Sequence, residues 1–255
     1  MSPAVHPQAL PFTANPEARV GVVLCHGFTG SPASMRPWAQ ALADASRRVE
    51  LPRLPGHGSC WQDLELTEWT DWYRVVEQSW YRLAADCEQV FVAGLSMGGA
   101  LALRLAQQHP VDGVMLVNPA IGADARSFRL LGLVRHLRRS IAAIGNDIAL
   151  PGAEEHAYPR TPLRPAHSMT RLWALVCRDL DRVDCEVLLM TSTTDHVVDA
   201  ASRRILREQL AGRLTEVELA RSFHVATLDH DAALLQRASL DFIAGNPPHR
   251  PQEAP

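Results

Sequence analysis

The sequence predicts an α/β protein whose mostly parallel central sheet is flanked by helices on both faces. Short apolar runs, typical of strands that are buried on both faces, alternate with stretches of helical periodicity. This alternation favours a parallel sheet, because a helix supplies the crossover between parallel strands. The expected strands are residues 20–25, 89–94, 113–118 and 186–191, with weaker candidates at 48–51 and 215–220. The expected helices are residues 35–45, 67–85, 97–108, 202–210 and 229–244.

One segment, residues 121–164, breaks this rhythm. It carries a helical pattern over residues 128–144 and then a loop that contains Pro159 and Pro162. We therefore expect a small helical cap inserted over the sheet of a single domain that covers residues 1–255. Residues 246–255 are polar and rich in proline, which predicts a disordered tail.

Composition limits the partners and the location of the protein. The net charge of -3 and the pI of about 6.4 give no sign of a nucleic-acid partner. The five cysteines show no metal-ligand spacing, so we expect reduced thiols, no metal and a cytoplasmic location. The segment Met1–Ala18 lacks the basic start and apolar core of a signal peptide, and no run of 18 apolar residues predicts a membrane span.

Ser96 is the candidate nucleophile. It lies in Gly94-Leu95-Ser96-Met97-Gly98, between an expected strand and an expected helix. A serine in this strand-turn-helix setting stands on a tight turn at the edge of the sheet, where its hydroxyl is accessible. The helix that follows also directs partial positive charge toward the serine.

A serine hydroxyl needs a base, and the base needs a carboxylate that orients it. Asp195 follows the expected strand 186–191, and His224 follows the expected strand 215–220. The order Ser, acid, His matches the order in which this arrangement occurs on α/β sheets. Three neighbours compete for these roles and are assigned elsewhere. We expect Asp199 to cap a helix, His196 to point away from Asp195, and His230 to lie on the surface; His57 precedes the nucleophile and is expected to fix a loop.

A tetrahedral intermediate also needs two backbone N–H donors. The amide of Met97, directly after the nucleophile, is one candidate. The loop after the first expected strand offers the other at Phe28, because Gly27 and Gly30 permit the turn that would aim this amide inward. This chemistry requires neither a metal nor a cofactor.

These motifs, taken in order, resemble the bacterial carboxylesterase and monoacylglycerol lipase branch of the α/β-hydrolases. The resemblance rests on residues 26–32, 54–58, 94–99, 195–198 and 224–229, and extends from about Val20 to Ala244. It implies an α/β-hydrolase fold, oxyanion donors at Phe28 and Met97, a cap from about Ile121 to Arg164, and a triad of Ser96, Asp195 and His224.

The cap supplies the candidate substrate-binding residues. Leu131 and Val134 belong to an apolar stripe that starts at Phe128, and we expect this stripe to pack over the acyl pocket, where the Phe28 side chain forms another wall. The basic residues beside the stripe raise the alternative of a transient contact with a membrane surface. Glu155 is a candidate acceptor for substrate hydroxyls such as those of glycerol, with a solvated surface carboxylate as the alternative.

The sequence thus predicts a serine hydrolase that cleaves short-to-medium acyl esters, with monoacylglycerols as the favoured substrates, through an acyl-enzyme on Ser96. A thioesterase or an acyltransferase would use the same triad. A ligand-binding protein without activity is the least favoured alternative, because the triad is complete. Acyl length, alcohol group and oligomeric state are left open by the sequence.

Overall fold

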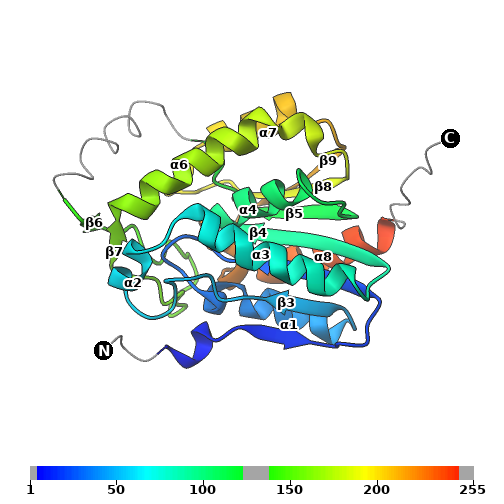
Figure 1. Cartoon of the computed structure of the whole chain (residues 1–255), viewed down its shortest axis with the longest axis horizontal. Coiled ribbons are helices and arrows are strands. Elements are labelled where there is room, and N and C mark those ends of the chain that lie inside the picture. The colour runs from blue at the N-terminus through cyan, green and yellow to red at the C-terminus, as the bar shows by residue number, and fades with distance from the viewer. Residues whose placement is uncertain (1–4, 123–137, 247–255) are drawn as a thin grey trace.

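The computed structural model describes residues 5–122 and 138–246. A seven-stranded sheet runs through its centre (Figure 1). The order of its strands is β1 (Phe12–Ala14), β3 (Arg48–Leu51), β2 (Val20–Cys25), β4 (Gln89–Leu95), β5 (Gly113–Val117), β8 (Val187–Ser192) and β9 (Leu214–Leu219). Every neighbouring pair is parallel except β1 and β3, which are antiparallel at one edge. The carboxyl ends of the parallel strands therefore meet at one edge of the sheet, where ligands bind in open α/β folds.

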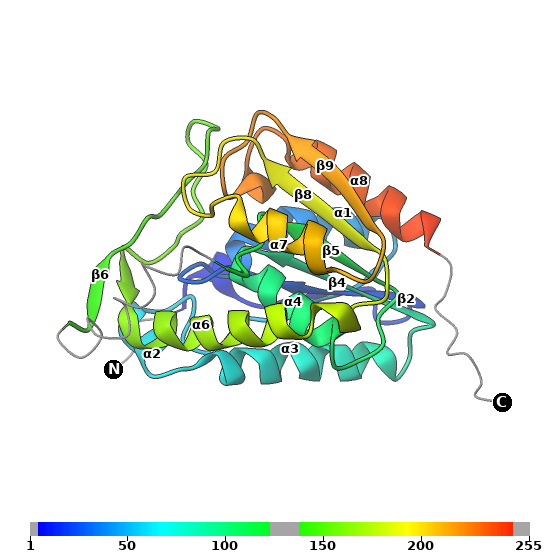
Figure 2. The same cartoon turned by 90° about the horizontal axis from the view of Figure 1, so that it is seen from above.

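Helices cover both faces of this sheet (Figure 2). The helices α3 (Trp69–Ala84), α4 (Met97–Ala106), α6 (Leu163–Arg178) and α7 (Ala201–Gln209) pack into one core, whereas α1 (Arg36–Asp44) and α8 (Ala232–Gly245) pack into the other. Within residues 5–122 and 138–246, the remaining helical elements are the short α2 (Trp61–Glu65) and the 3-10 turns Pro7–Ala9, Pro32–Met35, Leu180–Arg182 and Ala226–Leu228.

The central strands supply both cores at once, because successive side chains of a strand point to opposite faces. In β4, Val90 and Val92 belong to the core under α3 and α4, and Phe91 and Ala93 belong to the core under α1 and α8. A strand buried on both faces has no polar positions to alternate with apolar ones, which explains the continuous apolar runs in the sequence.

All six expected strands are present, with ends shifted by no more than one residue, and the α/β prediction is confirmed. The edge strand β1 was not predicted, because three residues without a buried side chain carry little pattern. The helix α6 was also not predicted, because Pro159, Pro162 and Pro165 resemble loop residues. Pro165 lies in the first turn of α6, where the missing backbone N–H breaks no intrahelical hydrogen bond.

The cap differs from the expected helix in the part that the structure describes. Instead of continuing a helix to Ile144, the chain forms β6 (Ser140–Ala142), which pairs antiparallel with β7 (Arg160–Pro162). The helical prediction is therefore wrong over residues 138–144, where the structure has a three-residue strand flanked by irregular chain. Residues 123–137, which include Leu131 and Val134, lie outside the described residues.

The single-domain organisation stays a prediction, as does the disordered tail, of which residues 247–255 lie outside the described part of the chain. Within the described ranges, no helix has both the length and the apolar character needed to cross a membrane.

Candidate active site

Ser96 stands on a strained turn between β4 and α4. Its backbone angles, φ 57° and ψ -120°, lie in a region that non-glycine residues rarely adopt. Such a conformation costs about 1–3 kcal/mol and persists only when its surroundings enforce it. Here the Ser96 amide donates to the carbonyl of Val117 on β5 at 3.0 Å, and the Ser96 carbonyl accepts from Gly99 and Ala120.

Two glycines make this turn sterically accessible. A Cβ at Gly94 would lie 2.2 Å from the carbonyl oxygen of Gly98, and a Cβ at Gly98 would lie 1.9 Å from that of Cys25. Only glycine therefore lets α4 begin so close to the ends of β2 and β4. The expected strand-turn-helix setting of Ser96 is present in the structure.

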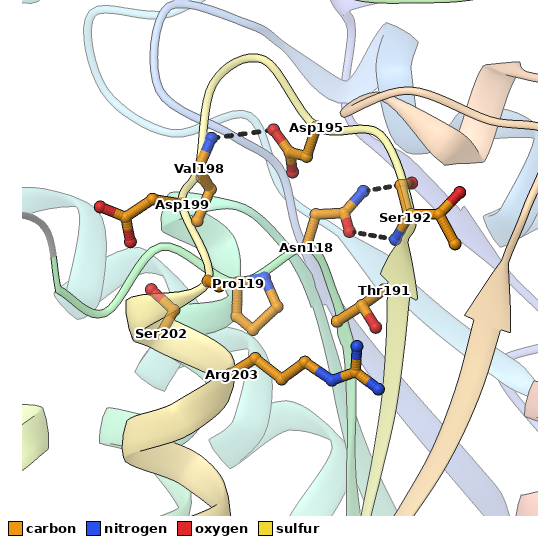
Figure 3. Close-up of a pocket in the computed structure, with 11 residues that line it drawn as sticks. Asn118, Pro119, Thr191, Ser192, Asp195, Val198, Asp199, Ser202 and Arg203 are labelled. Atoms are coloured by element: carbon orange, nitrogen blue, oxygen red, sulfur yellow. Dashed lines mark hydrogen bonds between the residues drawn. The ribbon is translucent and has the colours of Figure 1, made fainter.

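Asp195 and His224 lie in hydrogen-bond contact. The carboxylate oxygen Oδ2 of Asp195 is 2.8 Å from Nδ1 of His224, and both side chains are nearly buried. The other oxygen, Oδ1, accepts the amides of Val197 and Val198 at 2.8 Å each; the bond to Val198 is drawn in Figure 3. Burial alone would raise the pKa of Asp195, but the bonds from His224 and the two amides outweigh it, and the pKa is lowered. The carboxylate is thus held ionised, which suits a group that orients a histidine.

Asn118, at the end of β5, braces the loops that carry these two residues. Its side-chain amide exchanges two hydrogen bonds with Ser192 (Figure 3). It also donates to the backbone carbonyl of His224 at 2.8 Å. Its φ of 42° is left-handed, a conformation that asparagine tolerates better than most residues. The sequence analysis missed this role, although an asparagine directly after a buried strand was the available signal.

A cavity of about 580 Å³ opens beside these residues and is lined by both Ser96 and His224. One wall is apolar and comes from α6, through Leu163, Ala166, Met169 and Trp173. The opposite side includes Phe28 and Thr29 from the loop after β2, and Glu155 from the cap. The predicted wall at Phe28 and the predicted position of Glu155 in the pocket agree with this lining.

The loop that contains Phe28 lies directly against Ser96. A Cβ at Gly27 would lie 3.6 Å from the Cβ of Ser96. The backbone segments that carry the amides of Phe28 and Met97 are therefore neighbours. His26 fastens this loop from inside: its ring Nδ1 donates to the carbonyl of Gly27 at 3.0 Å, and its Nε2 accepts the amide of Leu54 at 3.2 Å. These two bonds require the neutral imidazole.

His26 and His57 are both fully buried and in contact, with ring centroids 4.9 Å apart. Burial lowers the pKa of His26 to about 4 and lowers that of His57 well below its ordinary value. His57 also donates from Nδ1 to the carbonyl of Pro55, which agrees with the expected loop-fixing role.

We predict that these histidines make stability fall as the pH drops from 6.5 toward 4. The unfolded chain binds protons below about pH 6.5, whereas the folded His26 binds none until about pH 4. The free energy of unfolding therefore keeps its full value above about pH 6.5 and falls in acid. At pH 5, the protonation of His26 in the unfolded chain alone lowers it by about 2 kcal/mol. Urea unfolding at pH 7.5 and pH 5 measures this difference.

His26→Asn isolates the contribution of His26, because it should reduce the loss of stability between these two pH values. His230→Asn is the matched control, since His230 is exposed and outside this cluster. An equal loss of stability in the parent and in His26→Asn would contradict the prediction.

The residues that competed for the triad roles make other contacts. Asp199 accepts the amide of Ala201 at the start of α7, one residue before the N-cap, and His230 is exposed in the turn before α8 rather than within the helix. The ring of His196 points to Asp147, with Nδ1 2.7 Å from Oδ1, and so turns away from Asp195 as expected.

Glu155 is held at the cavity by the cap itself. Its Oε1 accepts the backbone amide of Asn146 at 2.8 Å, while Oε2 accepts no hydrogen bond from the described residues. Burial raises the pKa of this carboxyl, and the bond from Asn146 offsets part of the effect.

Two further carboxylates in this region, those of Asp147 and Asp229, bind the cap to the loop that carries His224. Their roles were not predicted from the sequence, where Gly145-Asn146-Asp147 resembles an ordinary turn.

A smaller cavity of about 350 Å³ lies on the other side of the loop that carries Asp195 (Figure 3). It is lined mainly by polar residues from the ends of β5 and β8 and the start of α7. Among the described residues, no group of three or more histidine, cysteine, aspartate or glutamate side chains could hold a metal ion.

A strained serine after β4, an Asp–His pair from the ends of β8 and β9, and a shared cavity define a site of the serine-hydrolase type on a mostly parallel sheet. The model of the alpha/beta hydrolase family matches residues 22–237. The chain therefore belongs to the alpha/beta hydrolase family, and the predicted fold is confirmed.

Relatives with known activities are similar over most of the chain. It is 41% identical to a thermostable monoacylglycerol lipase of Bacillus sp. strain H-257 over 238 residues, which cover 92% of this chain and 94% of the relative. It is 23% identical to a carboxylesterase of Bacillus subtilis strain 168, covering 94% and 97% of the two chains. A solved structure from work on the metagenome-derived lipolytic enzymes LipS and LipT has a TM-score of 0.90 at 34% identity, covering 94% and 99%. The chain is accordingly a carboxylic ester hydrolase, as predicted.

Proposed function

We propose that Ser96, Asp195 and His224 form the catalytic triad of this ester hydrolase. The observation that carries the proposal is the convergence of three separate strand ends: Ser96 after β4 and His224 after β9 line one cavity, and Asp195 after β8 is bonded to His224 behind it. The backbone amides of Phe28 and Met97 are the proposed oxyanion donors, because their loops adjoin at Ser96.

The reaction follows from these roles. Nε2 of His224 takes the proton of Ser96 Oγ as the oxygen attacks the ester carbonyl, and the oxyanion is stabilised by the two amides. The carbonyl re-forms, the bond to the alkoxy oxygen breaks, and His224 passes its proton to the departing alcohol. Water, deprotonated by His224, then attacks the acyl-enzyme and releases the carboxylic acid and Ser96. Asp195 stabilises the imidazolium in both half-reactions and stays ionised.

A monoacylglycerol is the substrate that the cavity suits best. The apolar wall from α6 would take the acyl chain, whereas Glu155 would accept hydrogen bonds from the glycerol hydroxyls through Oε2. A carboxylate in a half-buried position is a strong acceptor for such hydroxyls. The 41% identical relative is a monoacylglycerol lipase, which supports this assignment.

The cap is also the proposed site of a transient contact with a lipid surface. Ile141, Ile144 and Val197 line the cavity and are 42%, 67% and 40% exposed, so apolar side chains stand at its mouth. Leu131 and Val134 stay predicted members of the acyl pocket, and the cytoplasmic location stays a prediction.

A panel of monoacylglycerols and p-nitrophenyl esters of equal acyl length tests the substrate assignment. We predict that Glu155→Gln raises KM about tenfold for monoacylglycerols, because a charged acceptor is lost, and leaves KM for the p-nitrophenyl esters within about twofold. Glu154→Gln is the matched control, since this neighbour is exposed and does not line the cavity.

An equal effect of Glu155→Gln on both ester series would contradict the glycerol subsite. Faster turnover of acyl thioesters than of all oxygen esters would favour a thioesterase, and acyl transfer to an added alcohol in preference to water would favour an acyltransferase. A protein that turns over none of these compounds would be a ligand-binding member of the fold.

A further inference from the structure

Asp147, in the cap, contacts the loops of both the histidine and the acid. Its Oδ2 accepts the backbone amide of His224 at 3.1 Å and that of His196 at 3.2 Å. Its Oδ1 lies 2.7 Å from the ring Nδ1 of His196, and its backbone carbonyl accepts the amide of Val225 at 3.1 Å. We propose that Asp147 is a positioning residue that sets the general base against its acid; this proposal rests on the proposed triad.

The need for such a residue follows from how the acid and the base are held. Asp195 is fixed within its own loop, because its Oδ1 accepts the amides of Val197 and Val198. His224 stands on a different loop, after β9. Ser192 and Asn118 connect the start of the acid loop to Phe223 and His224, whereas the bond between Asp195 and His224 joins the two loops through the catalytic groups themselves. Asp147 adds a connection through backbone amides, which does not depend on the protonation of His224.

Asn118 and Asp147 hold the backbone of His224 from two sides. Asn118 binds the carbonyl of His224 from the end of β5, and Asp147 binds its amide from the cap. With Nδ1 bound to Asp195, three separate elements thus fix the imidazole. Misplacing a catalytic group by about 1 Å can lower the rate about 100-fold, so the loss of one of these anchors should appear in kcat.

The placement of Asp147 links the cap to the chemistry. The side chain of Asp147 is only 11% exposed. The residues that follow it in the cap are also hydrogen-bonded to the histidine loop. The carboxylate of Asp229, beyond His224, accepts the amides of Ala149 and Leu150, and also that of Phe223. The cap segment around residues 146–150 is therefore bound to the histidine loop on both sides of His224, so the cap contributes to the geometry of the base and not only to the pocket.

Three substitutions separate this role from a general effect on the cap. Asp147→Ala removes both oxygens and should lower kcat about 10- to 100-fold for p-nitrophenyl butyrate, with KM within about threefold. Asp147→Asn can accept both backbone amides through its one oxygen and donate to a neutral His196, so it should restore most of kcat. Asp147→Glu keeps the charge but moves the carboxylate by one methylene, and should resemble Asp147→Ala.

Glu154→Ala is the matched control. It also removes a carboxylate from the cap, but Glu154 is exposed and does not line the cavity. It should leave kcat for the short ester within about twofold. Thermal unfolding of each variant shows that the comparison concerns folded protein, and Asp147→Glu carries the test if Asp147→Ala does not fold.

Parental kcat in folded Asp147→Ala or Asp147→Glu would overturn the proposal. So would a loss in Glu154→Ala equal to that in Asp147→Ala, or a loss confined to KM. Ser96→Ala and the parent protein are assayed alongside. Ester turnover that survives in Ser96→Ala would contradict the proposed triad, whereas normal parental turnover with unchanged Asp147 variants would contradict the positioning role alone.

Discussion

Replacing Ser96 with alanine is expected to lower kcat/KM for p-nitrophenyl butyrate about 10⁴- to 10⁶-fold, because no acyl-enzyme can form without the hydroxyl. The fold should be unchanged. Alanine keeps the Cβ and the backbone hydrogen bonds of Ser96 to Val117, Gly99 and Ala120, and it tolerates the positive φ about as well as serine does. Ester hydrolysis, circular dichroism and thermal unfolding together check this prediction.

A fluorophosphonate probe tests the same residue without a turnover assay. The parent should become labelled and Ser96→Ala should not. Ser46→Gly is the control, because Ser46 is exposed and its φ of 62° suits glycine; it should be labelled like the parent. Undiminished labelling or hydrolysis in folded Ser96→Ala would show that another residue is the nucleophile.

Gly98→Ala is expected to have the largest effect on stability. The added Cβ would lie 1.9 Å from the carbonyl oxygen of Cys25 and 2.8 Å from that of His26, and both are backbone atoms at the end of β2. Because neither can rotate away, α4 or β2 must shift, which should destabilise the protein by about 3 kcal/mol or more. Thermal unfolding should show a melting temperature lowered by about 10 °C.

The displaced backbone in Gly98→Ala leads directly into the loop of Phe28, so the remaining folded protein should also have a reduced kcat. Gly245→Ala is the matched control. It also places a Cβ on a helical glycine, but nothing lies within 4 Å of that position. Its melting temperature should equal or exceed that of the parent, and an equal loss in both variants would contradict the steric argument.

The sheet and the order of the triad candidates could be predicted from the sequence because they depend on short, local signals. A buried parallel strand is a continuous apolar run, and the residue after it lies at the binding edge of the sheet. Ser96, Asp195 and His224 all follow such runs, and for this reason their positions in the structure agree with the expectation.

The residues that hold the site together were harder to predict, because their roles depend on contacts between distant segments. Asn118 bonds to residues 74 and 106 positions away, and Asp147 to one 77 positions away. The cap was predicted as a helix over residues 128–144, but residues 140–142 pair with β7 and form a strand. A local pattern does not contain the partner strand, and the prolines before α6 concealed a helix that begins beside them.

The two halves of the cavity come from different parts of the chain. The apolar wall belongs to α6, which packs on α4 and so belongs to the framework of the sheet, whereas Glu155 belongs to the inserted segment. With the proposed binding mode, a substitution in the insert, or the replacement of the whole insert, would alter recognition of the alcohol while the acyl preference is retained. Substitutions on α6 would do the reverse. Such a division would allow a family to diversify its substrates one end at a time.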